Sequence, residues 1–297
     1  MLQTLINAVG FGAVYALMAV GIALVFGVLR LVNFAYGQLV MAGAYALALT
    51  SAHGWPTWAM LLTCLGVVVG LSLLMEVALF RPLRNASPAT MLVATFAVAF
   101  LLQSIALLKF GSLAKVANIF PHLFDPVAGG GQFATVRWIT IVAIVAAVVG
   151  VAGLTLLLGR TSLGLHMRAA AADFETARLL GVRANAVITA AVVLSGVLAA
   201  VVSVILVVET PFVLPTFALH DTIIVLVGVV VGGIDRLWTA TLGGFSIGFA
   251  TSVFTDKLPQ NATGYVDSAV FGLVILVLLL RPEGLFTPFR AHAVERV

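Results

Sequence analysis

Side chains that could catalyse a reaction or bind a metal are few in this sequence, and they lie far apart. The HExxH pattern, which places two histidines on one helix face, is absent, and so is the GxSxG motif of serine hydrolases. Gly129–Gly131 is not followed by Gly-Lys-Ser/Thr, so it predicts a flexible loop and not a phosphate-binding loop. Cys64 is alone, which excludes an intrachain disulfide. We therefore expect neither an enzyme nor a metal site, and no cofactor bound by this chain.

The composition is that of a polytopic membrane protein. Of 297 residues, 62% are hydrophobic and only 9% are charged, against about 25% charged in soluble domains. The formal net charge of +4 comes from arginines scattered at the ends of apolar segments. That distribution suits anionic lipid headgroups and gives no basic patch for nucleic acid.

Apolar segments of membrane-spanning character follow one another along the whole chain. A span needs about 20 apolar residues to cross ~30 Å of hydrocarbon. Residues 222–233 and 240–254 are short for this, so they predict tilted spans or half-helices that line a cavity. We expect one transmembrane domain over residues 1–297, all-α, with about 8–10 transmembrane helices. The segments are Leu5–Leu29, Asn33–Thr50, Trp58–Phe80, Met91–Leu108, Trp138–Leu158, Ala186–Val208, Thr222–Gly233, Ala240–Phe254 and Val266–Leu280.

The arginines also predict the orientation. Arg30, the Arg81–Arg84 loop, the Arg160–Arg183 loop, Arg236 and Arg281 all face the cytoplasm if each segment crosses once. The N-terminus then lies outside and the C-terminus in the cytoplasm. Two lysines, Lys109 and Lys115, fall on the outer side as exceptions.

The most polar stretch, residues 159–185, predicts a cytoplasmic contact element. Asp173 is a favourable helix N-cap, and Glu175 lies in the first turn, where the helix dipole favours an acid. Gly181 supplies a C-terminal stop. A short capped helix between two spans indicates a surface for a partner outside the membrane.

Uncharged polar residues within the spans leave two interpretations open. They line a pathway for a polar solute, or they form hydrogen bonds between helices, worth ~0.6 kcal/mol each on average. For Ser104, Ser195 and Ser203 we favour the structural role. The candidates for a substrate path are Asn33, Tyr36, Gln38 and Gln103.

Glu76 is the main candidate for an ion-coupling acid. Its distance of about one turn from Arg81 favours an ion pair at the end of a span instead. An Arg-Pro pair ends the apolar span within both Met75–Arg84 and Ile275–Gly284. This similarity is either a trace of two repeated halves of the chain or a chance resemblance.

Several motifs resemble one family. Glu175–Gly181 (ETARLLG) resembles the E-A-A-x-x-x-G loop of ABC-importer permeases, with threonine in place of the first alanine. Its surroundings, GRTSLGLHMRAAAADFETARLLGV, resemble the version in branched-chain amino-acid permeases, as do LRLVNFAYGQLVMAGAY, RPLRNASP, VGVVVGGI and LLLRPEGLF. The resemblance covers nearly the whole chain, in order.

This resemblance implies a membrane subunit in the cytoplasmic (inner) membrane of a bacterium. It implies a second permease (a paralogue or the same chain), a periplasmic or lipoprotein binding protein, and cytoplasmic ATPase subunits that use ATP. The ATPase would contact a helix with an apolar side of Phe174, Ala177 and Leu180. The coupling residues implied are Asp173, Glu175, Ala177, Arg178 and Gly181.

One departure from the family affects the expected substrate. Many relatives carry histidine and an acid where this chain has Tyr36 and Gln38. We expect an importer of branched-chain or other small apolar amino acids. The alternatives are a permease for urea or short amides, or a stand-alone secondary transporter or channel.

Overall fold

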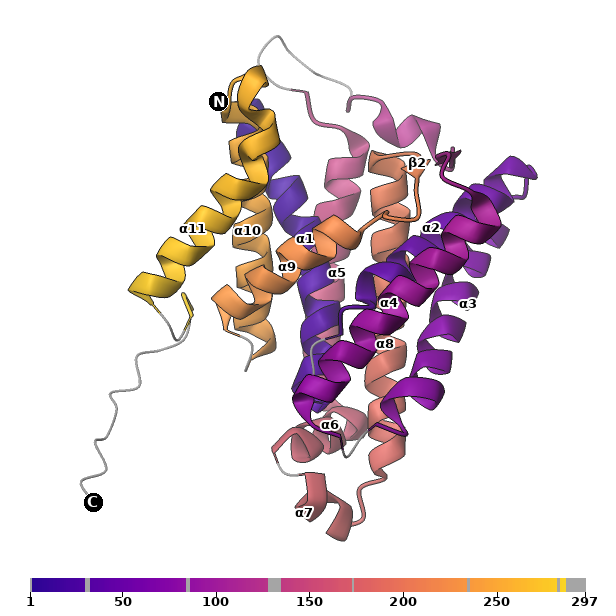
Figure 1. The fold of residues 1–297 in the computed structure, drawn as a ribbon, viewed down its shortest axis with the longest axis vertical. Coiled ribbons are helices and arrows are strands. Elements are labelled where there is room, and N and C mark those ends of the chain that lie inside the picture. Colours follow the sequence, from indigo (N-terminus) through magenta and orange to yellow (C-terminus); the bar gives the residue numbers. More distant parts are fainter. Residues whose placement is uncertain are drawn as a thin grey trace.

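The computed structural model describes residues 2–29, 33–83, 86–127, 135–172, 174–233, 236–281 and 284–286, almost all of them in helices (Figure 1). Its strands, β1 (Lys115–Val116) and β2 (Phe212–Val213), form one short antiparallel pair. Short 3-10 segments cover Pro121–Phe124 and Gln260–Tyr265. The helices are α1 (Leu2–Leu29), α2 (Tyr36–Ala52), α3 (Thr57–Met75), α4 (Pro88–Phe110), α5 (Trp138–Arg160), α6 (Ser162–Ala172), α7 (Phe174–Leu179), α8 (Ala184–Glu209), α9 (Leu219–Gly232), α10 (Leu237–Lys257) and α11 (Val266–Leu280).

The predicted all-α membrane architecture is confirmed. Each of the nine apolar segments of the sequence corresponds to a helix, and 6 helices among the described residues are long and apolar enough to cross a membrane. Helix α9 has 14 residues and therefore measures about 21 Å, less than the ~30 Å of hydrocarbon. It matches the prediction of a short helix over residues 222–233. The prediction of a short segment over residues 240–254 is wrong, because α10 has 21 residues and is long enough to cross a membrane.

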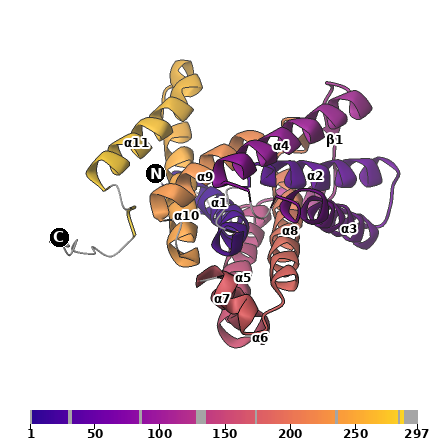
Figure 2. The same ribbon diagram turned by 60° about the horizontal axis from the view of Figure 1, so that its bottom comes forward.

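Successive membrane helices alternate in direction, so the bundle has two ends (Figure 1). At one end, the β1–β2 pair joins the segments that follow α4 and α8. The start of α1 lies there too, because Gln3 is hydrogen-bonded to Thr135 just before α5. We call this the β end. The opposite end carries α6 and α7, and we call it the α7 end (Figures 1 and 2).

Helix α1 lies at the centre of the bundle, and glycines let α10 approach it closely. A Cβ at Gly248 would lie 2.8 Å from the Tyr15 Cβ, and one at Gly244 would overlap Ala19. Such small residues are typical of helix contacts in membranes, where packing replaces the hydrophobic driving force. Most residues of α4 and α5 are not buried inside the bundle, as expected of helices that face lipid.

The helix contacts divide the chain into two similar halves of opposite direction. Helix α1 packs on α10 as α8 packs on α3, and α2 packs on α3 as α9 packs on α10. Figure 1 shows α1 and α8 running in opposite directions, and likewise α2 and α9. This is the pattern of an inverted repeat formed by α1–α4 and α8–α11. The Arg-Pro similarity does not mark it, because α11 corresponds to α4 and not to α3.

Candidate functional site

Two short helices, α6 and α7, project from the α7 end between α5 and α8 (Figure 2). Thr161 begins α6, since its Oγ1 accepts the backbone N–H of Gly164 at 3.1 Å. Met167 and Ala170 are buried and attach α6 to the bundle. Only one short helix was predicted from the sequence here. Helix α6 was missed because His166 and Arg168 interrupt its apolar pattern.

Helix α7 ends at Leu179, and Gly181 supplies the C-terminal stop, as predicted. Gly181 has φ +89°, and the N–H of Val182 donates to the carbonyl of Ala177 at 3.0 Å, the bond of a Schellman motif. Ala177 is buried, whereas Leu179 and Leu180 are 88% and 80% exposed. Leu180 lies past the last helical residue and differs from Ala177 in its exposure. The apolar contact side of Phe174, Ala177 and Leu180 stays a prediction.

The other predicted coupling residues are located only in part. Glu175 and Arg178 lie within α7, and the structure describes their backbone but not their side chains. Asp173, the predicted N-cap, lies outside the described residues.

The predicted substrate-path residues Tyr36 and Gln38 lie where α2 and α9 begin, deep in the bundle. Both side chains are 0% exposed. Within the described part of the chain, the Tyr36 hydroxyl and both polar atoms of the Gln38 amide have no hydrogen-bond partner. A buried polar group without a partner costs roughly 1–3 kcal/mol, which marks this spot as unusual.

The close approach of α2 to its neighbours explains this burial. A Cβ at Gly21 of α1 would overlap the Tyr36 hydroxyl, and one at Gly37 would lie 2.8 Å from the carbonyl oxygen of Ala218. Ala218, just before α9, has φ +60°. The two short helices thus meet at their N-terminal ends.

The two remaining candidates differ from this pair. The side chain of Asn33 accepts the N–H of Ala35 at 3.1 Å and so shapes the turn before α2, a structural role. Gln103 lies on α4 and is half-buried, with an unpaired Oε1 within the described residues. Its helix joins α2 through the rings of Phe34 and Phe96, 5.6 Å apart.

Three other polar residues of the spans, Glu76, Ser195 and Ser203, form an ion pair or hydrogen bonds within the bundle, as predicted. Glu76 is buried, and its carboxylate lies 3.4 Å from the guanidinium of Arg81. Ser195 donates to the carbonyl of Gly21, and Ser203 lies 2.9 Å from the carbonyl of Val40. These contacts hold α8 against α1 and α2.

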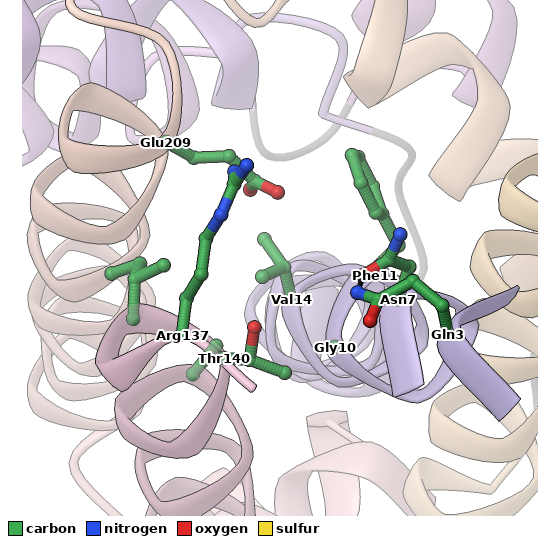
Figure 3. Close-up of a pocket in the computed structure, with 10 residues that line it drawn as sticks. Gln3, Asn7, Gly10, Phe11, Val14, Arg137, Thr140 and Glu209 are labelled. Atoms are coloured by element: carbon green, nitrogen blue, oxygen red, sulfur yellow. Dashed lines mark hydrogen bonds between the residues drawn. The ribbon is translucent and has the colours of Figure 1, made fainter. Parts of the chain in front are cut away.

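A polar cavity of about 140 Å³ opens at the β end between α1, α5 and α8 (Figure 3). The side chains of Arg137 and Glu209 extend into it, and those of Gln3 and Asn7 lie across from them. Neither Glu209 nor Arg137 was among the candidate residues predicted from the sequence. The available signal was an arginine directly before a span on the side where arginines are rare.

Comparison with known proteins identifies the family. The family model described as branched-chain amino acid transport system / permease component matches residues 4–279. The chain belongs to this family. The permease is 30% identical over 296 residues to the high-affinity branched-chain amino acid transport system permease protein BraD of Pseudomonas aeruginosa, covering 96% of this chain and 95% of that protein. It is also 30% identical to LivH of Escherichia coli K12, covering 96% and 94%.

Among solved structures, a chain of a metal-chelate type ABC transporter in an inward-facing conformation aligns over 93% of the permease and 86% of its own length. The TM-score is 0.49 at 19% identity. The relatives are named as transport permeases, so the expectation of a multi-pass transport subunit that is not an enzyme is confirmed.

Proposed function

We propose that this chain is the transmembrane subunit of an ATP-driven importer for branched-chain or other small apolar amino acids, in the cytoplasmic (inner) membrane. The observation that carries this proposal is the family match over residues 4–279, together with relatives named for that transport. Residues 1–297 form one transmembrane domain, and residues 159–185 form its coupling loop.

The distribution of basic residues supports a cytoplasmic position for the α7 end. The helix ends gathered there carry Arg81, Arg160, Arg183, Arg236 and Arg281. The β end carries fewer basic residues, namely Lys109, Lys115, Arg137 and Lys257. By the positive-inside rule the N-terminus lies outside and the C-terminus in the cytoplasm.

Helices α6 and α7 are the proposed contact with an ATPase subunit. Leu179 and Leu180 are exposed, and they lie at the end of α7, which projects from the bundle (Figure 1). Under the proposed orientation this end lies in the cytoplasm, so lipid tails do not cover the two leucines. Exposed leucines beside a short helix suit a groove on a protein partner. Because Met167 and Ala170 attach α6 to the bundle, a displacement of α7 would reach α1, α5 and α8. ATP is used by that partner and not bound by this chain.

The contact between α2 and α9 is the proposed centre of the substrate path. Two short helices meet there, at the interface of the inverted halves, and leave Tyr36 and Gln38 without partners within the described residues. Transporters of this architecture commonly bind substrate beside such helix ends. We infer that these polar groups gain partners when the path opens. A second permease subunit completes the path, and a binding protein delivers substrate at the β end.

Uptake of labelled leucine tests this proposal. Cells that lack the chain should lose leucine uptake, and the wild-type gene should restore it, with competition by valine and isoleucine. Because Tyr36 and Gln38 are uncharged, urea and acetamide should be included as competitors. Competition by these amides without competition by valine would assign the permease to amides, and uptake independent of the chain would refute the proposal.

A further inference from the structure

The cavity at the β end carries opposite charges on facing helices. Arg137 precedes the first residue of α5, and Glu209 is the last residue of α8; Figure 3 shows their side chains extending toward each other. Gln3, Asn7 and Thr140 add uncharged polar groups to the lining. This part of the cavity can bind an anion and a cation of one small molecule at neighbouring points.

A second acidic side chain lies close to the cavity lining. Asp221, at the start of α9, accepts the hydroxyl of Tyr15 at 2.7 Å and lies within electrostatic range of Glu209. Among the described residues, the lining itself carries one acidic and one basic side chain, Glu209 and Arg137, and Asp221 is a second acidic group nearby. An acidic side chain is suited to bind an ammonium group, and a guanidinium is suited to bind a carboxylate with two parallel hydrogen bonds.

The rest of the cavity is apolar and of limited size. Phe11, Val14, Ile139 and Ala143 form the apolar part of the lining. A cavity of about 150 Å³ accommodates a molecule the size of benzene, and this one measures about 140 Å³. This volume includes the polar part of the cavity, so it favours an amino acid with a small aliphatic side chain over an aromatic one.

Gln3 helps to hold the cavity open in one geometry. Its amide donates to the Asn7 side chain at 2.9 Å and to the carbonyl of Thr135 at 3.0 Å, and its Oε1 accepts the N–H of Thr135 at 2.7 Å. These bonds fix the segment before α5 against α1. Arg137 is two residues further along the chain, so its position relative to α1 is fixed by the same bonds.

We propose that this cavity is a binding site for free zwitterionic amino acids with small aliphatic side chains. Arg137 binds the carboxylate, Glu209 binds the ammonium group with Asp221 adding to the negative field, and the apolar wall contacts the side chain. The proposal rests on the proposed function, because it places the site on the side where a binding protein would release substrate.

Binding by the purified full-length chain in lipid nanodiscs tests the site, with three probes that share the isobutyl group of leucine. Leucine has both charges, 3-methylbutylamine lacks the carboxylate, and 4-methylpentanoate lacks the ammonium group. The wild-type chain should bind leucine more tightly than either analogue. Arg137→Gln should weaken leucine binding about tenfold or more while leaving amine binding unchanged, since a hydrogen bond to a charged group is lost. Glu209→Gln should likewise weaken leucine binding while leaving 4-methylpentanoate binding unchanged.

Two charge variants at the same end of the bundle serve as controls. Lys109→Gln removes a positive charge at the end of α4, and Asp267→Asn removes a negative charge at the start of α11; neither residue lines the cavity. Both should bind all three probes as the wild-type chain does. If Arg137 and Glu209 only join α5 to α8, their variants will lose stability without changing the preference among the probes.

The outcome separates this site from the proposed function. Absence of leucine binding by the wild-type chain, or an unchanged preference in both charge variants, overturns the site. Leucine uptake that depends on the chain would still support the importer in that case. The proposed importer function is refuted only if deletion of the chain leaves leucine uptake unchanged.

Discussion

Gly37 of α2 faces Thr222 of α9 so closely that a Cβ on Gly37 would overlap the Thr222 Oγ1. The Thr222 hydroxyl in turn donates to the carbonyl of Ala218 at 2.6 Å. Only a residue without a side chain lets the two helices meet at this point. The contact brings Tyr36 and Gln38, whose buried polar atoms lack hydrogen-bond partners among the described residues, into the interface between the inverted halves.

Gly37→Ala is therefore expected to destabilise the permease by about 1–3 kcal/mol, the usual cost of overpacking. Gly66→Ala is the matched control, because a Cβ at Gly66 on α3 meets nothing within 4 Å. Thermal unfolding in detergent should show a lower Tm for the first variant and an unchanged or higher Tm for the second. Equal Tm values would contradict the close contact.

Gln38→Leu separates a substrate-path role from a structural one. Both polar atoms of this buried amide lack partners within the described residues, so a leucine of similar size should leave the Tm unchanged or raise it. Transport should nevertheless fall several-fold if the amide binds substrate in another state. Parallel loss of Tm and transport would indicate that Gln38 only supports the fold.

Replacing both exposed leucines, Leu179→Ser with Leu180→Ser, is expected to weaken ATPase association without affecting the fold. Their side chains are largely solvent-exposed, so little buried apolar area is lost in the isolated chain. Copurification of the ATPase with the permease should fall, and transport with it. Leu108→Ser, an exposed leucine on α4, is the control. Full ATPase recovery with the double variant would exclude these leucines from the contact.

Glu76 and Arg81 should differ in how much their loss costs. Arg81→Gln removes the cation beside the Glu76 carboxylate, which is buried with 1% of its side chain exposed. Glu76→Gln removes the buried charge itself. After allowance for the half-exposed arginine, we expect Arg81→Gln to cost about 1–2 kcal/mol and Glu76→Gln less. Chemical unfolding measures both. Uptake by Glu76→Gln should persist and resist a protonophore while ATP is maintained; sensitivity would support an ion-coupling role.

The membrane class, the helical segments and the family followed from local properties of the sequence. Length and apolarity alone locate segments such as Trp138–Leu158, because each span must satisfy its own backbone hydrogen bonds in lipid. The stop at Gly181 was also predictable, since a positive φ is favourable only for glycine. The motif around Glu175 identified the family without any knowledge of contacts.

The tertiary structure decided what depends on distant segments meeting. Gly37 and Thr222 are 185 positions apart, and no local pattern indicates that their helices share an interface. The same holds for Arg137 and Glu209, which are 72 positions apart and lie in one cavity only because α5 and α8 are neighbours. In lipid nearly every helix surface is apolar, so hydrophobicity does not select which helices pack together. The steric fit of small residues selects them, and that fit depends on the three-dimensional arrangement of the helices.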